Sequence, residues 1–278
     1  MPLSRIETIL VPTDFSDADA VAFAHALKLA LVIGAELDIF HVEPNNEQTD
    51  WHWAPSVLAT LRRWGVLGAH AGENEMAGLG VRARRTVATG MSPDAGILQE
   101  MVSARADLVV MATQGRSGIE TWTRPSVSVP VATRGSVPVL VVPSHARGFV
   151  SPGTGAGAIR RVLVPIDYRP DPGPAYAAVP DLVRPLAAED VEVATMHVGS
   201  GSPQTAGLVV PETWSVRRLD QPGGDVVDAI VRTAEAWEAD LVVMVTEGRA
   251  TFLDALRGST VERVLQRVKT PVLVVPAK

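Results

Sequence analysis

The chain has 278 residues, a mass of 29.5 kDa and a net charge of −6, and 46% of its residues are hydrophobic. This length suits two domains of about 140 residues with packed cores, and no apolar run reaches the roughly 18 residues of a membrane-spanning helix. Each half carries a net charge of −3, which argues against a nucleic-acid-binding module. The absence of cysteine excludes disulfides and thiolate nucleophiles. Because residues 1–7 do not resemble a signal peptide, we expect a cytoplasmic protein.

An internal repeat predicts two copies of one domain. Residues 108–118 return as 241–251 with seven of eleven positions identical, and 138–143 return unchanged as 271–276. At the start of each copy, 9–15 matches 162–168, so the second copy is twenty residues shorter. We expect a first domain at 1–146, a linker at 147–158 in a glycine-rich segment that packs little, and a second domain at 159–278.

Strands and helices alternate along the first copy. Apolar runs at 9–11, 37–42, 108–112 and 139–142 predict strands buried on both faces, which is typical of parallel sheets. A helix is expected from a cap at Ser16-Asp17 to Gly34, a second at 55–76, and a third from Ser92. The pattern predicts an α/β protein of two repeated doubly wound (Rossmann-like) parallel five-stranded domains.

The second copy is expected to be eroded. Pro180 and Pro185 should kink or split its first helix. Only 14 residues separate Val198 from Thr213, too few and too glycine-rich for a covering helix. We therefore expect 208–210 to be exposed beside an uncovered sheet face.

The whole chain resembles the universal stress protein family in its tandem form. The resemblance is carried by 11–16, His41-Val42, 107–118 and 137–142, with matching segments in the second copy. It implies an internal pseudo-dimer in which the last strands of the two domains lie side by side. It also implies a stress-response protein that acts by binding a nucleotide or a protein partner.

The resemblance further implies ATP as a cofactor, held by a Gly-x2-Gly-x9-Gly-Ser/Thr loop and an aspartate after the first strand. Glycines in such a loop let backbone N–H groups approach phosphate oxygens. The second copy matches these positions with Asp167 and with a loop formed by Val245, Gly248, Gly258 and Ser259. The first copy matches them with Asp14 and with a loop formed by Ala112, Gly115, Pro125 and Ser126.

Both loops depart from the pattern. Pro125 has no N–H to donate, and Val245 places a β-branched side chain at the first glycine position. Because Gly258-Ser259 is kept, the second copy is the expected site of any nucleotide. The alternative is that the glycines serve turn geometry alone.

Other polar residues have simpler interpretations. His41 and His197 at matching strand ends are expected to pack or hydrogen-bond, because no histidine spacing indicates a metal site. Asp17 and Asp19 are interpreted as helix-capping acids. Ser126 and Ser259 are expected to cap helices or contact phosphate rather than to act as nucleophiles, so no catalytic residue is assigned.

Two further groups of side chains stand out. Arginines at 82, 84 and 85, echoed at 217 and 218, are expected to protect the exposed edges of the sheet. Tryptophans at 51, 53 and 64 should pack on the first domain. Three functions remain open: regulated binding of a nucleotide or a protein partner, slow ATP hydrolysis or phosphotransfer at the second loop, and binding of an apolar ligand or partner. Self-association as a dimer is also expected.

Overall fold

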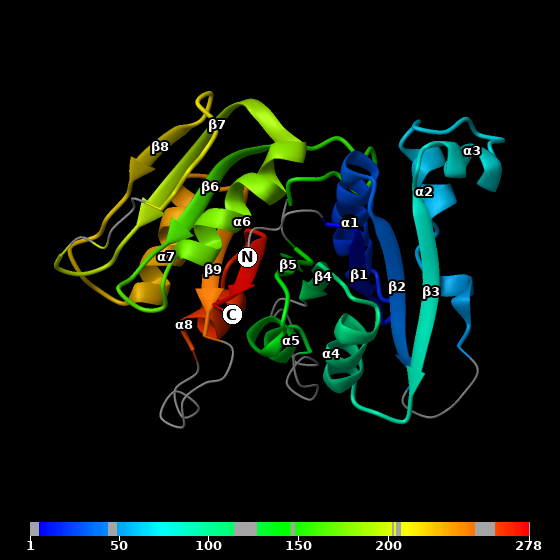
Figure 1. Cartoon of the computed structure of the whole chain (residues 1–278), viewed down its shortest axis with the longest axis horizontal. Coiled ribbons are helices and arrows are strands. Elements are labelled where there is room, and N and C mark those ends of the chain that lie inside the picture. The colour runs from blue at the N-terminus through cyan, green and yellow to red at the C-terminus, as the bar shows by residue number, and fades with distance from the viewer. Residues whose placement is uncertain are drawn as a thin grey trace.

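The computed structural model describes residues 6–43, 49–113, 127–145, 148–201, 203, 207–247 and 259–277. These residues form ten strands in one sheet of order β3-β2-β1-β4-β5-β10-β9-β6-β7-β8 (Figure 1). The strands are β1 (Thr8–Pro12), β2 (Glu36–Glu43), β3 (Arg82–Thr89), β4 (Leu108–Thr113), β5 (Val139–Pro143), β6 (Ile159–Pro165), β7 (Ala187–Met196), β8 (Ser215–Arg218), β9 (Leu241–Thr246) and β10 (Val272–Pro276).

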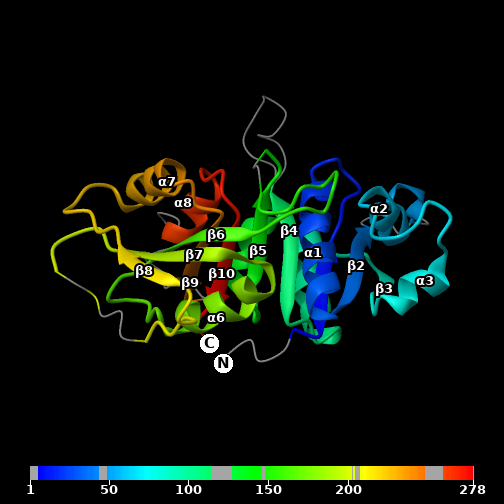
Figure 2. The ribbon, with the colours of Figure 1, turned by 90° about the horizontal axis from the view of Figure 1, so that it is seen from above.

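Helices cover both faces of this sheet. They are α1 (Asp19–Ile33), α2 (Val57–Arg63), α3 (Glu73–Gly78), α4 (Pro93–Ser103), α5 (Ser128–Arg134), α6 (Gly173–Val183), α7 (Val226–Ala236) and α8 (Thr260–Leu265), with 3-10 turns η1 (Trp51–Trp53) and η3 (Arg184–Leu186). Helices α1, α2 and α6 share one apolar core, and α4, α5, α7 and α8 share the other. Figure 2 shows α6 on one side of the sheet and α7 and α8 on the other. The α/β prediction of two repeated domains is confirmed.

The two halves join through their final strands. β5 and β10 pair antiparallel, with Val141 opposite Val272 and Val139 opposite Val274, whereas every other strand pair is parallel. Both strands are almost wholly buried, so pairing them removes two apolar edges from solvent. The expected internal pseudo-dimer is thereby confirmed, and β3 and β8 are left as the edges.

The segment between the halves packs more closely than expected. Phe149 and Val150 are buried, and their N–H groups donate to the Nε2 atom of His25 over 3.1 and 3.2 Å. The indole N–H of Trp64 donates to the carbonyl of Pro152. The expectation of a loosely packed linker is wrong, because the segment satisfies buried polar atoms of the first half. The boundaries at 146 and 159 stay a prediction.

Two expectations for the first half need correction. Helix α1 begins at Asp19 rather than after Ser16, and it ends at Gly34 as predicted, with φ of 74°. The helix expected over residues 55–76 is instead two short helices, α2 and α3. Gly65 lies between them with φ of 69°, a left-handed conformation that interrupts a helix.

The second half is reduced in the expected place, though less than predicted. Helix α6 continues through Pro180, and the break comes later, where Pro185 lies in η3. Residues 207–214, the longest described stretch of the short crossover, contain no helix. Val209 is 76% exposed, but Leu208 and Val210 are half-buried against the core. The exposure prediction is therefore right for Val209 alone.

No helix in the described ranges combines the length and apolar character needed to cross a membrane.

Candidate functional site

Each half has an aspartate at a topological switch point of the sheet. Asp14 follows β1, which lies between β2 and β4, and Asp167 follows β6, which lies between β7 and β9. Helices leave the sheet in opposite directions at such points, which opens a crevice at the carboxyl ends of the strands. Both aspartates are exposed. The two predicted aspartates thus occupy equivalent positions.

A histidine supports each aspartate-bearing turn. The Nδ1 atom of His41 lies 2.8 Å from the carbonyl oxygen of Thr13, and that of His197 lies 3.3 Å from the carbonyl oxygen of Ile166. In both halves the bonded carbonyl belongs to the residue before the aspartate. The prediction that the histidines serve hydrogen bonding is confirmed.

Aromatic side chains close the strand end in the first half. The Phe15 ring stacks on the His41 ring with centroids 4.3 Å apart, and Trp51 meets Phe15 edge-on at 5.7 Å. The Arg85 guanidinium lies 5.5 Å from the centre of the Trp51 ring, a cation–π contact. The rings of Phe15, His41 and Trp51 therefore pack on one another directly after Asp14.

Asp14 also lies beside a second acid. The Asp19 carboxylate accepts hydrogen bonds of 2.7 Å from the Thr13 hydroxyl and from the Asp14 N–H. Burial, followed by repulsion from Asp14, raises the pKa of Asp19 to about 7. Burial opposes ionisation of Asp14 as well, but hydrogen bonds from Ser16 outweigh it and lower the pKa of Asp14. Asp19 thus orders the strand-end turn rather than capping α1 in the expected manner.

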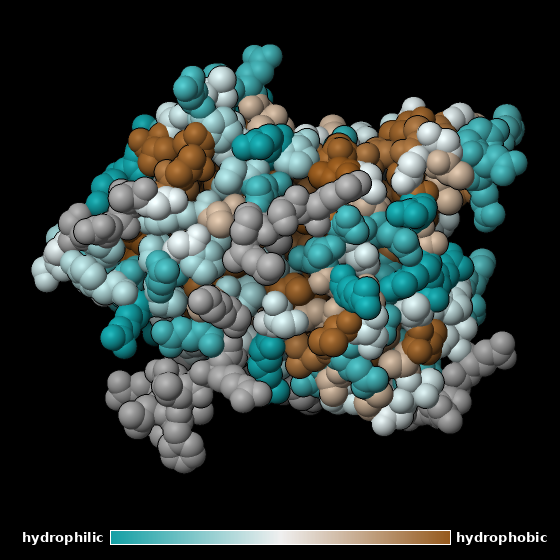
Figure 3. All heavy atoms as spheres, viewed as in Figure 1, coloured by the Kyte–Doolittle hydropathy of each residue, from teal (hydrophilic) through white to brown (hydrophobic). Residues whose placement is uncertain are grey.

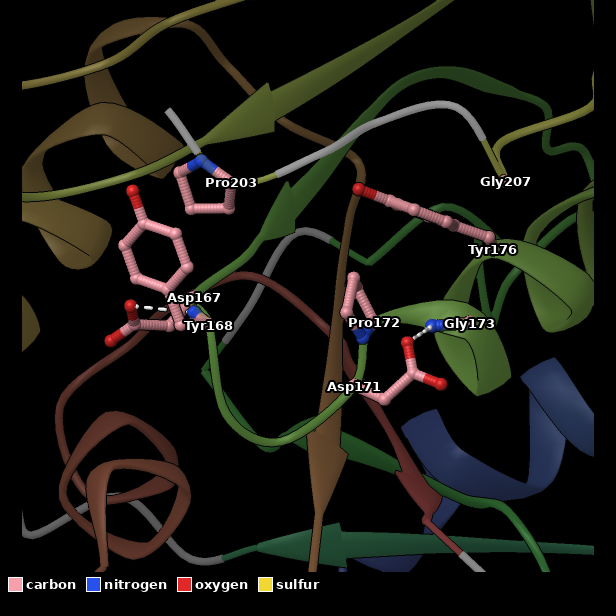
Figure 4. A pocket seen from close by; sticks show the side chains of 8 residues that line it. All are labelled: Asp167, Tyr168, Asp171, Pro172, Gly173, Tyr176, Pro203 and Gly207. Atoms are coloured by element: carbon pink, nitrogen blue, oxygen red, sulfur yellow. Dashed lines mark hydrogen bonds between the residues drawn. The ribbon is translucent and has the colours of Figure 1, made fainter. Parts of the chain in front are cut away.

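The described residues of the second half form a cavity at the equivalent strand end. It measures about 430 Å³ and lies beside Asp167, between the start of α6 and the short crossover (Figure 4). Its lining residues are Asp167, Tyr168, Asp171, Pro172, Gly173, Tyr176, Pro203 and Gly207. The volume is that of a small-molecule site.

Tyr168 takes the place that Phe15 has in the first half, but it packs differently. Its ring meets the His197 ring edge-on with centroids 5.7 Å apart, and 63% of the residue is exposed. Gly201, at φ of 105°, allows the Tyr168 hydroxyl to approach the backbone, where a Cβ atom would collide with it. The Nε2 atom of His197 is buried and has no hydrogen-bond partner in the described part of the chain. The Tyr168 ring is thus turned toward solvent.

Sequence reasoning did not find the other walls of the cavity. Tyr168 and Tyr176 are the two tyrosines of the chain, and both line it. This pairing was a signal available in the sequence. Asp171, by contrast, belongs to no motif of the sequence, and its place in the cavity depends on how the short crossover folds back over α6.

Most of the predicted phosphate loop lies outside the described residues. This applies to Gly115, Pro125, Ser126, Gly248 and Gly258.

Three predicted loop residues are described. The Ser259 hydroxyl accepts a hydrogen bond of 3.2 Å from the N–H of Glu262. It therefore caps α8, which is one of the two roles expected of it. Ala112 and Val245 are half-buried against the core shared by α1 and α6. The assignment of the cofactor-binding set is a prediction.

The edge arginines are held by acids on the neighbouring strand or just beyond their own strand. Arg84 donates to the fully buried Asp38 carboxylate over 2.7 Å, and Arg218 donates to Asp220 over 2.9 Å. Their strands, β3 and β8, are the two sheet edges. The predicted location at the edges is confirmed.

Comparison with known structures supports the fold. A universal stress protein from Archaeoglobus fulgidus superposes with a TM-score of 0.65 at 21% identity, covering 98% of this chain and 97% of its own. A Pseudomonas aeruginosa structure gives 0.64 at 19% identity, covering 99% and 94%. The cytoplasmic domain of a prokaryotic cation chloride cotransporter gives 0.50 at 10% identity, covering 98% and 96%.

Comparison with curated proteins gives no match. The sequence profile of the universal stress protein family matches residues 5–143 and 212–276. These segments fall in both halves and cover most of the chain. The chain therefore belongs to the universal stress protein family.

Proposed function

We propose that this protein binds an adenine nucleotide in its second half and acts through binding rather than catalysis. The observation that carries the proposal is the cavity of about 430 Å³ beside Asp167. It lies at the switch point where open α/β sheets bind ligands. A cytoplasmic location is part of the proposal, and cell fractionation tests it.

The difference between the two strand ends supports the choice of half. In the first half Phe15 and Trp51 fill the space after β1. In the second half Tyr168 is turned outward, and Asp167 is left 59% exposed at the cavity wall. One ligand per chain is therefore expected.

Titration calorimetry with AMP, ADP and ATP tests this directly. We expect a stoichiometry near one, and Asp167→Ala should weaken binding about tenfold, the cost of one hydrogen bond to a charged group. The matched variant Asp14→Ala should bind as the wild type does. Equal losses in both variants, or no binding of any nucleotide, would contradict the proposal. Release of inorganic phosphate from ATP would instead favour the hydrolase alternative.

A second candidate function is favoured by the cavity that adjoins the first. It measures about 500 Å³ and runs along α6 beside Val209, Val210 and Pro211. On the face that carries α1 and α6, apolar side chains gather in several separate patches (Figure 3). A partner or apolar ligand covering Val209 would bury this surface. Native mass spectrometry of purified protein distinguishes a copurified nucleotide from an apolar ligand.

A further inference from the structure

The second cavity of this half is a groove between α6 and the short crossover. It measures about 500 Å³, and Gly173, Tyr176 and Gly207 line both the groove and the cavity beside Asp167. The other residues that line the groove are Ala177, Pro180, Asp181, Arg184, Val209, Val210 and Pro211. Gly207 lies against the Tyr176 ring, and the other crossover residues of the lining follow it in the chain. The groove therefore runs from the start of α6 toward Arg184 at its end.

One face of α6 forms the first wall of the groove. The lining residues of this wall are at 173, 176–177, 180–181 and 184, which is the spacing of a single helical face. In the middle of the wall, Ala177 and Pro180 are half-buried, and their side chains are apolar. This wall therefore presents a low apolar surface that is partly open to solvent.

The crossover forms the second wall and carries a protruding apolar side chain. Among the large apolar side chains of the described residues, Val209 is the most exposed, at 76%. In the first half, Val57 and Leu61 of α2 are buried in the core on the same face of the sheet. The crossover residues 207–214 contain no helix. Val209 thus stands where a partner surface would bury it.

The two walls carry opposite charges at the same end of the groove. Arg184 is exposed at the end of α6. Glu212 is exposed as well, and it directly follows Pro211 of the crossover wall. The Trp214 N–H donates to the carbonyl of Pro211 over 2.9 Å, which places Glu212 in a turn. The other acid of the lining, Asp181, is half-buried, and its Oδ2 atom is enclosed by the protein. The exposed charges are therefore a cation on the first wall and an anion on the second.

Two copies of this surface are complementary to each other. A two-fold axis along the groove would lay the α6 wall of each copy over the crossover wall of the other, with the same ends together. Each Val209 would then meet the apolar middle of the opposite α6. Each Arg184 would face Glu212 of the partner subunit. Every contact would occur twice, as it does in an isologous interface.

We propose that this protein forms a two-fold symmetric dimer through the groove, with Val209 packed on α6 of the second copy and Arg184 paired with Glu212 of the partner subunit. The proposal rests on the second candidate function, because it names a second copy of the chain as the partner that covers Val209. It is separate from the pairing of β5 with β10, which joins the two halves of one chain.

Charge reversal tests the pairing. Because Arg184 and Glu212 are exposed, both variants should fold, and thermal unfolding checks this. We expect sedimentation velocity at tens of micromolar to show a dimer for the wild type. Arg184→Glu and Glu212→Arg should each raise the dissociation constant of the dimer about tenfold or more, because each change places like charges opposite each other at two points.

Combining the two changes distinguishes a specific pair from a change in net charge. An equimolar mixture of the Arg184→Glu and Glu212→Arg proteins, and the double variant, should both dimerise within about threefold of the wild type, because opposite charges face each other again. The matched control is Arg232→Glu on α7, which lies on the other side of the sheet from α6 (Figure 2). Arg232 is exposed, and its variant should associate as the wild type does.

The outcomes separate the dimer from the proposed functions. Single variants that dimerise as the wild type does would overturn the interface, and so would a mixture and a double variant that stay monomeric. Equal weakening by Arg232→Glu would have the same meaning. A monomeric wild type would overturn the dimer, whereas an apolar molecule in its native mass spectrum would leave the second candidate function standing. Calorimetry with nucleotides tests the first function independently.

Discussion

The carboxyl ends of β1 and β6 have the same backbone arrangement, but their aromatic side chains pack differently. In each, a histidine bonds the carbonyl that precedes the aspartate, and an aromatic ring follows the aspartate. After β1 that ring, Phe15, stacks on His41 under Trp51. After β6 the corresponding Tyr168 stands edge-on to His197 and is mostly exposed. One scaffold therefore supports packed aromatic rings at one strand end and a cavity at the other.

The crossover between the second and third strands of each half accounts for this difference. In the first half 38 residues separate Val42 from Val81, and they deliver Trp51 to the strand end. In the second half the shorter crossover brings Pro203 and Gly207 to the same region instead. Gly207 carries no side chain and lies against the Tyr176 ring. The shorter crossover thus supplies part of the lining of the cavity at the end of β6.

The largest expected difference between the halves concerns the acids that hold the edge strands. Asp38 is fully buried and accepts from Arg84 and Thr86, whereas Glu192, which pairs with Arg217, is partly exposed. Asp38→Ala should lower the free energy of unfolding by about 3 kcal/mol, because it removes two hydrogen bonds to a charged group. Glu192→Ala should cost less than about 1 kcal/mol. Urea denaturation measures both, and equal costs would contradict the comparison.

His25 of α1, which accepts hydrogen bonds from the N–H groups of Phe149 and Val150, should make the free energy of unfolding depend on pH. His25 is buried, and burial lowers its pKa from 6.5 to about 4. Between these values the unfolded chain binds more protons, so stability is lost as pH falls from about 6.5 to about 4. The loss attributable to His25 should be about 3 kcal/mol.

Asp19 acts in the opposite direction, since its pKa is raised, so the histidine must be isolated with a variant. His25→Gln keeps an acceptor for Phe149 and Val150 but does not titrate. Denaturation of both proteins at pH 7 and pH 4.5 gives the difference. The same pH dependence in wild type and variant would exclude this role of His25.

Removing the Trp51 ring, which packs at the end of β1, should lower the free energy of unfolding by a smaller amount. Trp51→Ala deletes the edge contact with Phe15 and the contact with Arg85, which together stabilise by about 1–2 kcal/mol. The matched variant Tyr168→Ala, at the end of β6, should cost less than about 1 kcal/mol. Thermal unfolding compares them, and a larger loss for Tyr168→Ala would contradict this comparison of the two strand ends.

The sequence predicted what depends on local pattern. Apolar runs identified β1, β2, β4 and β5, and the family resemblance implied that the last strands of the two halves lie side by side, as β5 and β10 do. It could not predict the contact of His25 with Phe149, because those residues are 124 positions apart and only the folded chain brings them together. Asp167 was identified by the resemblance, which implies an aspartate after the first strand of each half.

The smallest effect on stability is expected at the exposed end of the short crossover. Val209 is 76% exposed beside the second cavity, so Val209→Asp should change the free energy of unfolding by less than about 0.5 kcal/mol. It should nevertheless reduce self-association, because covering apolar surface stabilises a complex by about 25 cal/mol per Å². Val102→Asp, 67% exposed on α4 of the first half, is the control and should associate as the wild type does. Light scattering at tens of micromolar measures this. A wild-type protein that is monomeric there, with both variants indistinguishable from it, would mean that the short crossover is only a cover for its own half of the sheet.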